Sequence, residues 1–235
     1  NETYRAMLDE GFTQFLTAWG LSVIDGDTMV VDTPKTSYER RWTKPEVTYE
    51  SEVYNPYMRD AVRNGMPPID THSDEFGYYE DQNIGGGGHV YFKTATMLYN
   101  LKYVLGDSLF WHGMQHYFKQ WKFCHPYDED MRNSFTQATH ADLTWFFDAW
   151  ISTDKTIDYA VKGVKHNSRN GDQRIVFRRN GMQMPIDFQV LARDGKTYDF
   201  HIPNTWFNKP TSATVLPRWI GWDDLQREYT AHVDI

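Results

Sequence analysis

Apolar residues in the first two-thirds of the chain recur at helical spacing. Near the N-terminus, an apolar face and a glycine stop predict a helix formed by Leu8, Phe12, Phe15, Leu16, Trp19 and Gly20. The same spacing predicts helices over residues 90–105, 107–121, 128–138 and 142–150, with Gly106 closing the first of these and Asp107 and Asp142 as caps. We therefore expect this part of the chain to be mainly helical.

The hydrophobic period falls to two after about Asp158. Alternating runs over residues 174–178, 186–192 and 197–202 are separated by the turn pairs Asn170-Gly171, Asn180-Gly181 and Asp194-Gly195. Evenly spaced strands with such turns indicate a small antiparallel β-sandwich. The chain is therefore predicted to be α+β, with a helical domain over residues 1–158 and a β-sandwich-like domain over 159–235.

A long stretch between the predicted helices, residues 67–88, is rich in Pro, Gly and Asp and ends in Gly85, Gly86, Gly87 and Gly88. Loops of this length are usually functional or disordered. A phosphate-binding loop would need a Gly-Lys-Ser/Thr sequence and a surrounding βαβ unit, and neither accompanies these glycines. We therefore interpret the four glycines as a flexible loop.

The composition excludes several classes of protein. The 235 residues include 24 Lys and Arg against 32 Asp and Glu, a formal net charge of −8, so the chain is a poor candidate for binding nucleic acid. An apolar content of 40% argues against disorder, and no apolar run approaches the roughly 18 residues of a membrane span. The single cysteine, Cys124, allows no internal disulfide and is expected to be a buried or half-buried structural thiol. Extracytoplasmic and cytoplasmic locations both stay open.

Two histidines four residues apart, His112 and His116, share a face of their predicted helix. A zinc-binding helix would carry the pattern His-Glu-x-x-His, in which the Glu is the general base, but Gly113 stands in that place. Both histidines fall beside the apolar stripe. We therefore interpret them as solvated surface residues.

Two adjacent carboxylates, Asp9 and Glu10, interrupt the first apolar helix. A carboxylate that points inward is costly unless a cation or a hydrogen-bond donor meets it. A carboxylate in the first turn of a helix is instead stabilised by the helix dipole. The pattern alone leaves both interpretations open.

The sequence Leu8-Asp9-Glu10-Gly11-Phe12-Thr13, together with Asn1-Glu2 before it, resembles the zinc-site helix of the aminopeptidase N family, the gluzincin metallopeptidases. Glu10 matches the third zinc ligand of that family. Tyr91-Phe92-Lys93, followed by Met97-Leu98, is similar to the family's Tyr-x-Lys-Gly and Met-Leu segment, in which the Tyr is catalytic. The resemblance covers residues 1–158.

The resemblance implies the C-terminal half of a thermolysin-like catalytic domain, followed by a β domain. The parent protein would be a zinc metallopeptidase that hydrolyses the amino-terminal bond of a peptide substrate. Glu10 would be the anionic zinc ligand, and Tyr91 would stabilise the oxyanion. Asp9 would orient a zinc ligand, and the loop of Gly85, Gly86, Gly87 and Gly88 would adjust around the substrate.

Several parts of the family pattern are missing from this chain. It contains no His-Glu-x-x-His, whose second His would lie about ten residues before Asn1. The Gly-x-Met-Glu-Asn strand is also absent, and Thr94 replaces the usual Gly after Lys93. We therefore expect the chain alone to be inactive, to bind zinc only weakly, and to need the upstream half of the same protein.

Two other functions compete with a peptidase. A non-catalytic helical and β protein-interaction module would bind a partner through its aromatic surface. A two-carboxylate glycosidase is supported only by the abundance of acidic residues.

Overall fold

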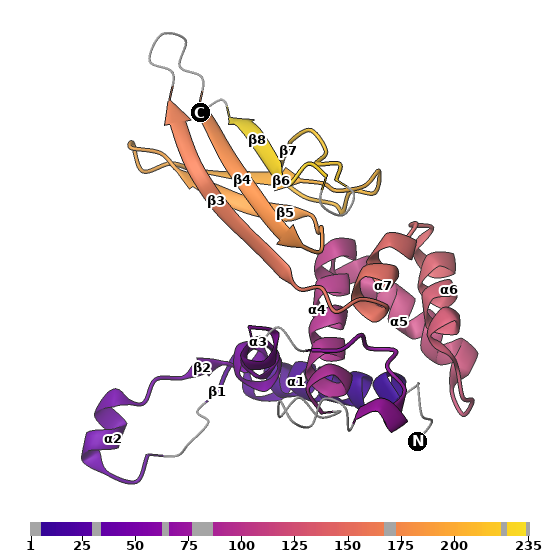
Figure 1. Ribbon diagram of the computed structural model, residues 1–235. Helices are drawn as coiled ribbons and strands as arrows, with labels where there is room; N and C mark the ends of the chain where they lie inside the picture. The colour runs from indigo at the N-terminus through magenta and orange to yellow at the C-terminus, as the bar shows by residue number, and fades with distance from the viewer. Residues whose placement is uncertain are drawn as a thin grey trace.

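The computed structural model describes residues 6–29, 34–62, 66–76, 87–166, 173–221 and 225–233. Strands β3 to β8 gather at one end of the molecule, and the helices lie at the other with the short β1–β2 pair, so the α+β class is confirmed (Figure 1). The helical elements, with π-helical segments labelled η, are η1 Met7–Gly11, α1 Phe12–Asp25, α2 Ser37–Trp42, η2 Glu50–Tyr54, α3 Asn55–Ala61, η4 Gly88–Lys93, α4 Thr94–Leu105, α5 Asp107–Trp121, α6 Asp128–Thr139 and α7 Thr144–Ile151. The strands are β1 Thr28–Met29, β2 Glu46–Val47, β3 Ile157–His166, β4 Gln173–Gly181, β5 Ile186–Leu191, β6 Thr197–Ile202, β7 Thr214–Val215 and β8 Glu228–Val233.

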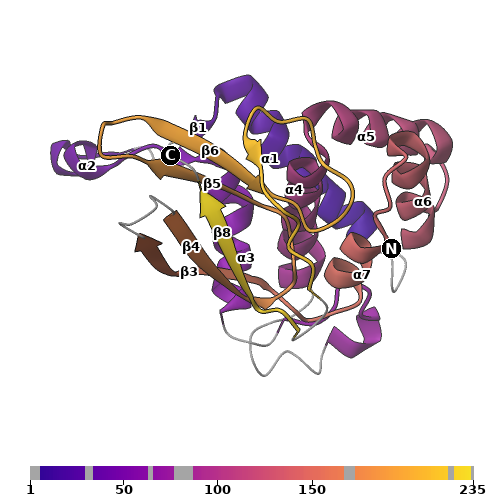
Figure 2. The ribbon, with the colours of Figure 1, turned by 90° about the horizontal axis from the view of Figure 1, so that it is seen from above.

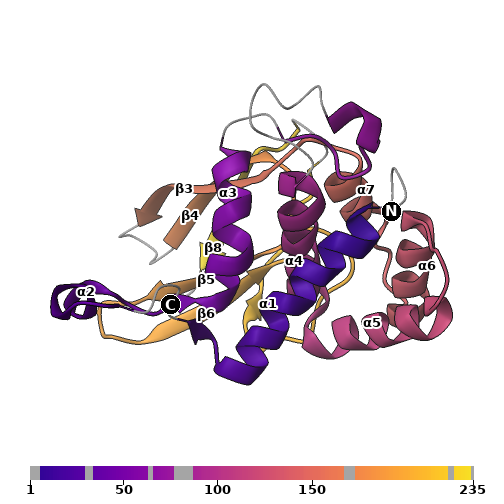
Figure 3. The same ribbon diagram turned by 90° about the horizontal axis from the view of Figure 1, so that it is seen from below.

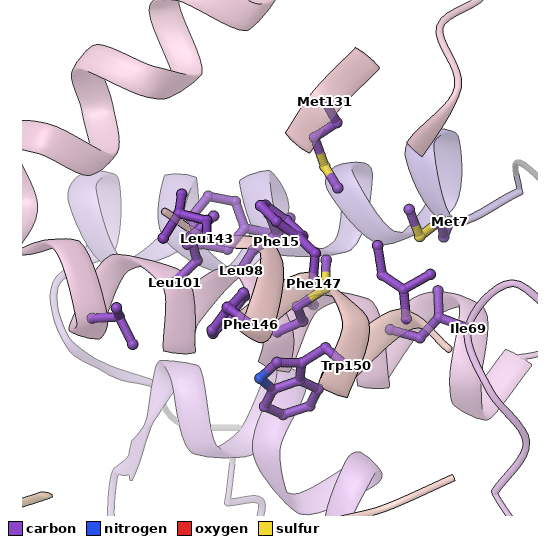
Figure 4. Close-up of a cluster of buried hydrophobic side chains, with 14 of the residues drawn as sticks. Met7, Phe15, Ile69, Leu98, Leu101, Met131, Leu143, Phe146, Phe147 and Trp150 are labelled. Carbon is purple, nitrogen blue, oxygen red and sulfur yellow. The ribbon is translucent and has the colours of Figure 1, made fainter. Parts of the chain in front are cut away.

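The helical part is built around a core rich in aromatic rings. Figure 4 shows Phe15 of α1, Leu98 and Leu101 of α4, and Phe146, Phe147 and Trp150 of α7 turned towards one another. The rings of Phe146 and Phe147 meet edge to face with centroids 5.5 Å apart, an arrangement that aromatic pairs prefer. The apolar faces predicted from the sequence are therefore the ones that the helices bury.

The ends of two helices differ from the prediction. Gly20 lies inside α1, which continues to Asp25 and ends at Gly26 with φ 98°. A glycine within a helix costs only about 1 kcal/mol, so Gly20 does not by itself stop the helix. Asp107 is the first residue of α5 and not its cap, and its carboxylate pairs with Lys102 at 2.9 Å.

Two three-stranded sheets form the sandwich. One has the antiparallel order β3-β4-β8, and the other has the order β5-β6-β7, in which β7 runs parallel to β6. Figure 2 shows the two sheets as separate layers. Their facing sides share one apolar cluster, in which Phe188 of β5 packs between Phe177 of β4 and Phe200 of β6 at centroid distances of 4.9 and 5.1 Å. The β-sandwich is therefore confirmed, although it is not antiparallel throughout.

The three predicted turns have different outcomes. Asp194-Gly195 forms the β5–β6 hairpin, with Gly195 at φ 85°. Asn180-Gly181 is not a hairpin turn: it ends β4, whose partners are β3 and β8, and the chain then passes to the other sheet. Gly181 is required there, since its φ is 70° and a Cβ would lie 2.1 Å from the carbonyl oxygen of Thr156. The pair Asn170-Gly171 lies outside the described residues.

The junction between helices and strands is packed. Helix α7 ends at Ile151 and β3 begins at Ile157, so the change from helices to strands lies close to residue 158. The division of the chain into two domains at this point stays a prediction. Met182 and Met184, which follow β4, are buried in the helical core cluster, and Tyr159 of β3 contacts both clusters. The helical and β parts therefore share apolar contacts.

Candidate active site

Glu10 and Tyr91 lie on two π-helical segments that approach each other closely. Glu10 belongs to η1 and Tyr91 to η4, and Figure 3 shows α1, which continues η1, crossing α4, which continues η4. At the crossing, a Cβ on Gly11 would lie 2.3 Å from Thr94 Cγ2 and 2.8 Å from the carbonyl oxygen of Val90. Only a glycine fits at this position, which explains the Glu-Gly pair of the sequence.

The close crossing places the Glu10 carboxylate against the Tyr91 hydroxyl. A hydrogen bond from this hydroxyl to Glu10, with the nearby charge of Asp9, raises the pKa of Tyr91 above its usual value. Glu10 and Tyr91 are half-buried, whereas Asp9 is exposed. The phenol therefore stays protonated at neutral pH and can donate a hydrogen bond beside a carboxylate. The structure thus brings Tyr91 together with Asp9 and Glu10, although Glu10 and Tyr91 are 81 positions apart in the sequence.

Two of the four glycines predicted to form a flexible loop have a helical conformation. Gly85 and Gly86 lie outside the described residues. Gly87 has helical φ and ψ, and Gly88 is the first residue of η4. A Cβ on Gly88 would lie 2.4 Å from Asp60 Oδ2, so this glycine serves close packing against α3 and is not part of a loop.

The described residues do not complete a zinc site. Within the described ranges, no group of three or more His, Cys, Asp or Glu side chains could hold a metal ion. Glu10 offers one carboxylate, whereas a catalytic zinc takes three protein ligands. His112 on α5 is exposed, as expected, and His116 lies 3.5 Å from Gln137 of α6. The described residues fit one part of a zinc shell and not the whole.

Gly113, between these histidines, has a structural explanation. A Cβ there would lie 2.4 Å from Phe135 Cδ1, because α5 and α6 cross at this point. A glutamate at this position would clash with the core. Cys124 follows α5 and is exposed, so the expectation of a buried or half-buried thiol is wrong. It lies beyond the last turn of the helix, where the apolar stripe has ended.

Two basic residues beside Tyr91 did not emerge from the sequence analysis as site residues. Lys93 is only 1% exposed, and burial lowers its pKa to about 8. His89 is fully buried, and burial, helped by the charge of Lys93, lowers its pKa to about 4. The signal in the sequence is the spacing of His89, Tyr91 and Lys93, which alternate between two sides of one helix.

A cavity of 1020 Å³ lies elsewhere, at the junction of the helical and β parts. Its wall includes Trp145 of α7, Met182, Trp206 and Arg218, but neither Glu10 nor Tyr91. The guanidinium of Arg218 stacks on the ring of Trp206 at 3.4 Å, and Trp206 is 87% exposed. This cavity is therefore distinct from the Glu10–Tyr91 pair.

Comparison with known proteins identifies the family. The model described as "Peptidase family M1 domain" matches residues 4–150. The chain belongs to peptidase family M1. This agrees with the resemblance to aminopeptidase N-like metallopeptidases that the sequence motifs suggested.

Individual relatives of this M1 domain are distant. Aminopeptidase N of Lactococcus lactis subsp. lactis is 28% identical over 102 residues, which are 42% of this chain and 11% of that protein. A crystal structure of Legionella pneumophila aminopeptidase A in complex with aspartic acid matches 98% of this chain and 22% of that chain, with a TM-score of 0.60 and 13% identity. The second match shows the fold. The chain spans only a small part of the length of either protein.

No helix among the described residues is long and apolar enough to cross a membrane.

Two glycines of the same helical run provide a matched test of the crossing. Gly11→Ala is expected to lower the free energy of unfolding by about 1–3 kcal/mol, because the added methyl overpacks the contact with Thr94. Gly20→Ala meets nothing within 4 Å and is expected to raise it by up to about 1 kcal/mol through helix propensity. Urea denaturation of both variants measures the difference. Equal effects of the two substitutions would contradict the close crossing.

Proposed function

We propose that this M1 domain is part of a zinc-dependent aminopeptidase-like enzyme that hydrolyses the amino-terminal bond of peptides. The observation that carries the proposal is the pairing of Glu10 with Tyr91 at the crossing of η1 and η4. A carboxylate and a phenol side by side are the two groups that the family resemblance assigns to this chain. The relatives named above, an aminopeptidase N and an aminopeptidase A, support the same class of reaction.

In this proposal Glu10 is the anionic zinc ligand and Asp9 orients a ligand from outside the coordination shell. The zinc ion, when bound, supplies polarisation of the scissile carbonyl and of a water molecule. The remaining ligands and the general base come from the upstream part of the parent protein. Tyr91 donates a hydrogen bond from its hydroxyl to the carbonyl oxygen, on which negative charge develops when the carbonyl carbon is attacked. Its raised pKa suits this role, since the hydroxyl remains a donor across the neutral range.

The direct test compares the parent protein with this chain on amino-acid amide and dipeptide substrates. The parent is expected to release the amino-terminal residue, and to lose this activity when a chelator removes its metal. The chain alone is expected to be inactive, because it lacks the general base and the other zinc ligands. Turnover by the purified chain that disappears in Glu10→Gln would refute the proposed division of roles.

Zinc binding gives a second prediction. Loss of a residue that only hydrogen-bonds to a zinc ligand typically lowers zinc affinity by about 10–100-fold. In the parent, Glu10→Gln alters a ligand itself, so its zinc affinity is expected to fall by more than this. Asp9→Asn, at the adjacent exposed position, is the matched control and should fall within that range or below it. Competition with a chromophoric chelator measures both affinities. For the chain alone, tight stoichiometric zinc binding that depends on Glu10 would contradict the proposal.

A non-catalytic interaction module is the second candidate. It is favoured by the cavity at the junction, where Trp206 is exposed under the guanidinium of Arg218. Such a module would retain Glu10 and Tyr91 without a His-Glu-x-x-His sequence in the parent. Sequencing the parent's coding region immediately before Asn1 separates the two candidates.

A further inference from the structure

Segment η4 carries its functional and its buried side chains on opposite sides. Residues two apart lie on roughly opposite sides of a helix, so Lys93 lies behind Tyr91. Tyr91 is half-buried and meets Glu10, whereas Lys93 is almost completely buried on the other side. The position of the Tyr91 hydroxyl therefore depends on what holds the buried side of η4.

The ammonium group of Lys93 joins η4 to two other parts of the chain. Its Nζ donates hydrogen bonds to the carbonyl oxygens of Pro67, at 3.2 Å, and Thr153, at 2.7 Å. Both acceptors are backbone atoms that lie far from Lys93 in sequence. A hydrogen bond donated by a charged group is about twice as strong as one between neutral groups. The side chain of Lys93 thus links η4 to these two segments of the chain.

The two acceptor segments are also fixed to each other. The amides of Ile69 and Asp70 donate to the carbonyl oxygen of Ile151, at 2.8 and 3.3 Å. The Thr153 hydroxyl donates to the carbonyl oxygen of Ala149 in α7, at 2.6 Å. The acceptors of Lys93 therefore belong to one rigid unit at the end of α7, and not to independent loops.

A buried ammonium group is a costly way to make such a link. Lys93 has no carboxylate in direct contact among the ion pairs of the described residues, although the charges of Asp70 and Asp154 act on it. Burial of a charge needs compensation by hydrogen bonds. An apolar side chain of similar length would fill the same space without this cost. The polar group is therefore explained by the connection it makes and not by packing.

We propose that Lys93 is the positioning residue of the site, and that its ammonium group, anchored to the carbonyl oxygens of Pro67 and Thr153, holds η4, and with it Tyr91, in place beside η1. Segment η4 is then held from two sides, by Gly11 of η1 at its front and by Lys93 at its back. The geometric part concerns this chain alone. Its catalytic consequence rests on the function proposed above.

The test uses the NMR signal of the Tyr91 ring at a fixed pH of 7, because its chemical shift reports the surroundings of the ring and its hydroxyl. The whole chain is labelled with ¹³C-tyrosine, and the Tyr91 signal is identified by its loss in Tyr91→Phe. In Lys93→Met, which keeps the apolar stem and removes the donors, the Tyr91 signal is expected to move towards that of a solvent-exposed tyrosine. Thr96→Val is the matched control: Thr96 is also buried in this helical run, and its hydroxyl has no partner among the described residues. It should leave the Tyr91 signal unchanged.

A folded Lys93→Met chain with an unchanged Tyr91 signal would overturn the proposal. If Lys93→Met does not fold, Lys93→Gln decides the question by the same measurement, since its amide is shorter and uncharged and cannot replace both charged hydrogen bonds. A shifted Tyr91 signal in that variant supports the proposal, and an unchanged one refutes it.

In the parent enzyme, Lys93→Met is expected to lower kcat by about 10–100-fold with a smaller change in KM, the cost of a displaced catalytic group. The loss should not add to that of Tyr91→Phe, because both variants remove one contact. Additive losses would overturn the catalytic consequence. A parent without any peptidase activity would refute the proposed function, whereas the Tyr91 NMR signal would still decide the role of Lys93.

Discussion

Tyr91→Phe in the parent enzyme is expected to lower kcat by about 10²–10³-fold, equivalent to about 2.7–4 kcal/mol of transition-state stabilisation. The substitution removes only the hydroxyl group. A donor that acts on the developing oxyanion contributes to the transition state and not to substrate binding, so KM should change much less. Steady-state kinetics on an amino-acid amide, with the melting temperature of each variant, measures both effects.

Tyr99→Phe is the matched control for this prediction. Tyr99 lies on α4 of the same helical run, and its ring packs on Phe15 with centroids 4.8 Å apart. Loss of its hydroxyl should leave kcat unchanged. If Tyr91→Phe also had wild-type turnover, Tyr91 would be a packing residue, and Tyr91→Ala would then lower stability without a specific effect on kcat.

The second large effect is expected on stability, and it comes from His89. The folded chain keeps His89 neutral down to about pH 4, whereas the unfolded chain takes up this proton near pH 6.5. Between these values the unfolded state binds more protons, so stability must fall as the pH falls. At about 1.4 kcal/mol per pH unit of difference in pKa, His89 accounts for a loss of up to about 3 kcal/mol between pH 6.5 and pH 4.

His89→Phe is expected to remove this part of the acid destabilisation. Neither ring nitrogen of His89 has a hydrogen-bond partner among the described residues, and the ring meets the edge of Phe76 at 4.8 Å. An apolar ring in its place should therefore leave stability at pH 7 unchanged or higher. Urea denaturation at several pH values between 4 and 7 measures the slope. Parallel slopes for the wild type and His89→Phe would exclude His89 as the titrating group.

The helices and strands could be predicted because each buries a face whose spacing is visible in the sequence. The runs ending at Leu105 and Ile202 end where the structure ends α4 and β6. The errors concern turns and helix ends. Their signals are local in the sequence, but whether the chain turns or a helix ends there depends on tertiary packing. Asn180-Gly181 signals a change of direction, but no property of the pair tells whether the next strand joins the same sheet. Gly20 signals a helix end, which occurs at Gly26 instead.

The candidate site was only partly visible for a similar reason. Glu10 and Tyr91 stand out through the order of motifs shared with the family, but their contact depends on how closely two helices can cross. Gly11 makes that crossing possible, and its role appears only when Thr94 and Val90 are placed beside it. Lys93 was visible only as one residue of the family motif. Its role could not be predicted, because its two acceptors are backbone oxygens that have no signature in the sequence.

The methionines after β4 determine which exchanges of the β-sandwich between related enzymes would preserve the fold. Met182 and Met184 complete the core around the helices, and the hydroxyl of Tyr159 holds their segment by accepting from the amide of Met184 at 2.7 Å. A sandwich transplanted from a distant relative would bring different side chains to this contact and leave a void in the helical core. Recombination between such enzymes should therefore tolerate exchanges that carry the helices and strands together, and reject those that separate them at residue 158.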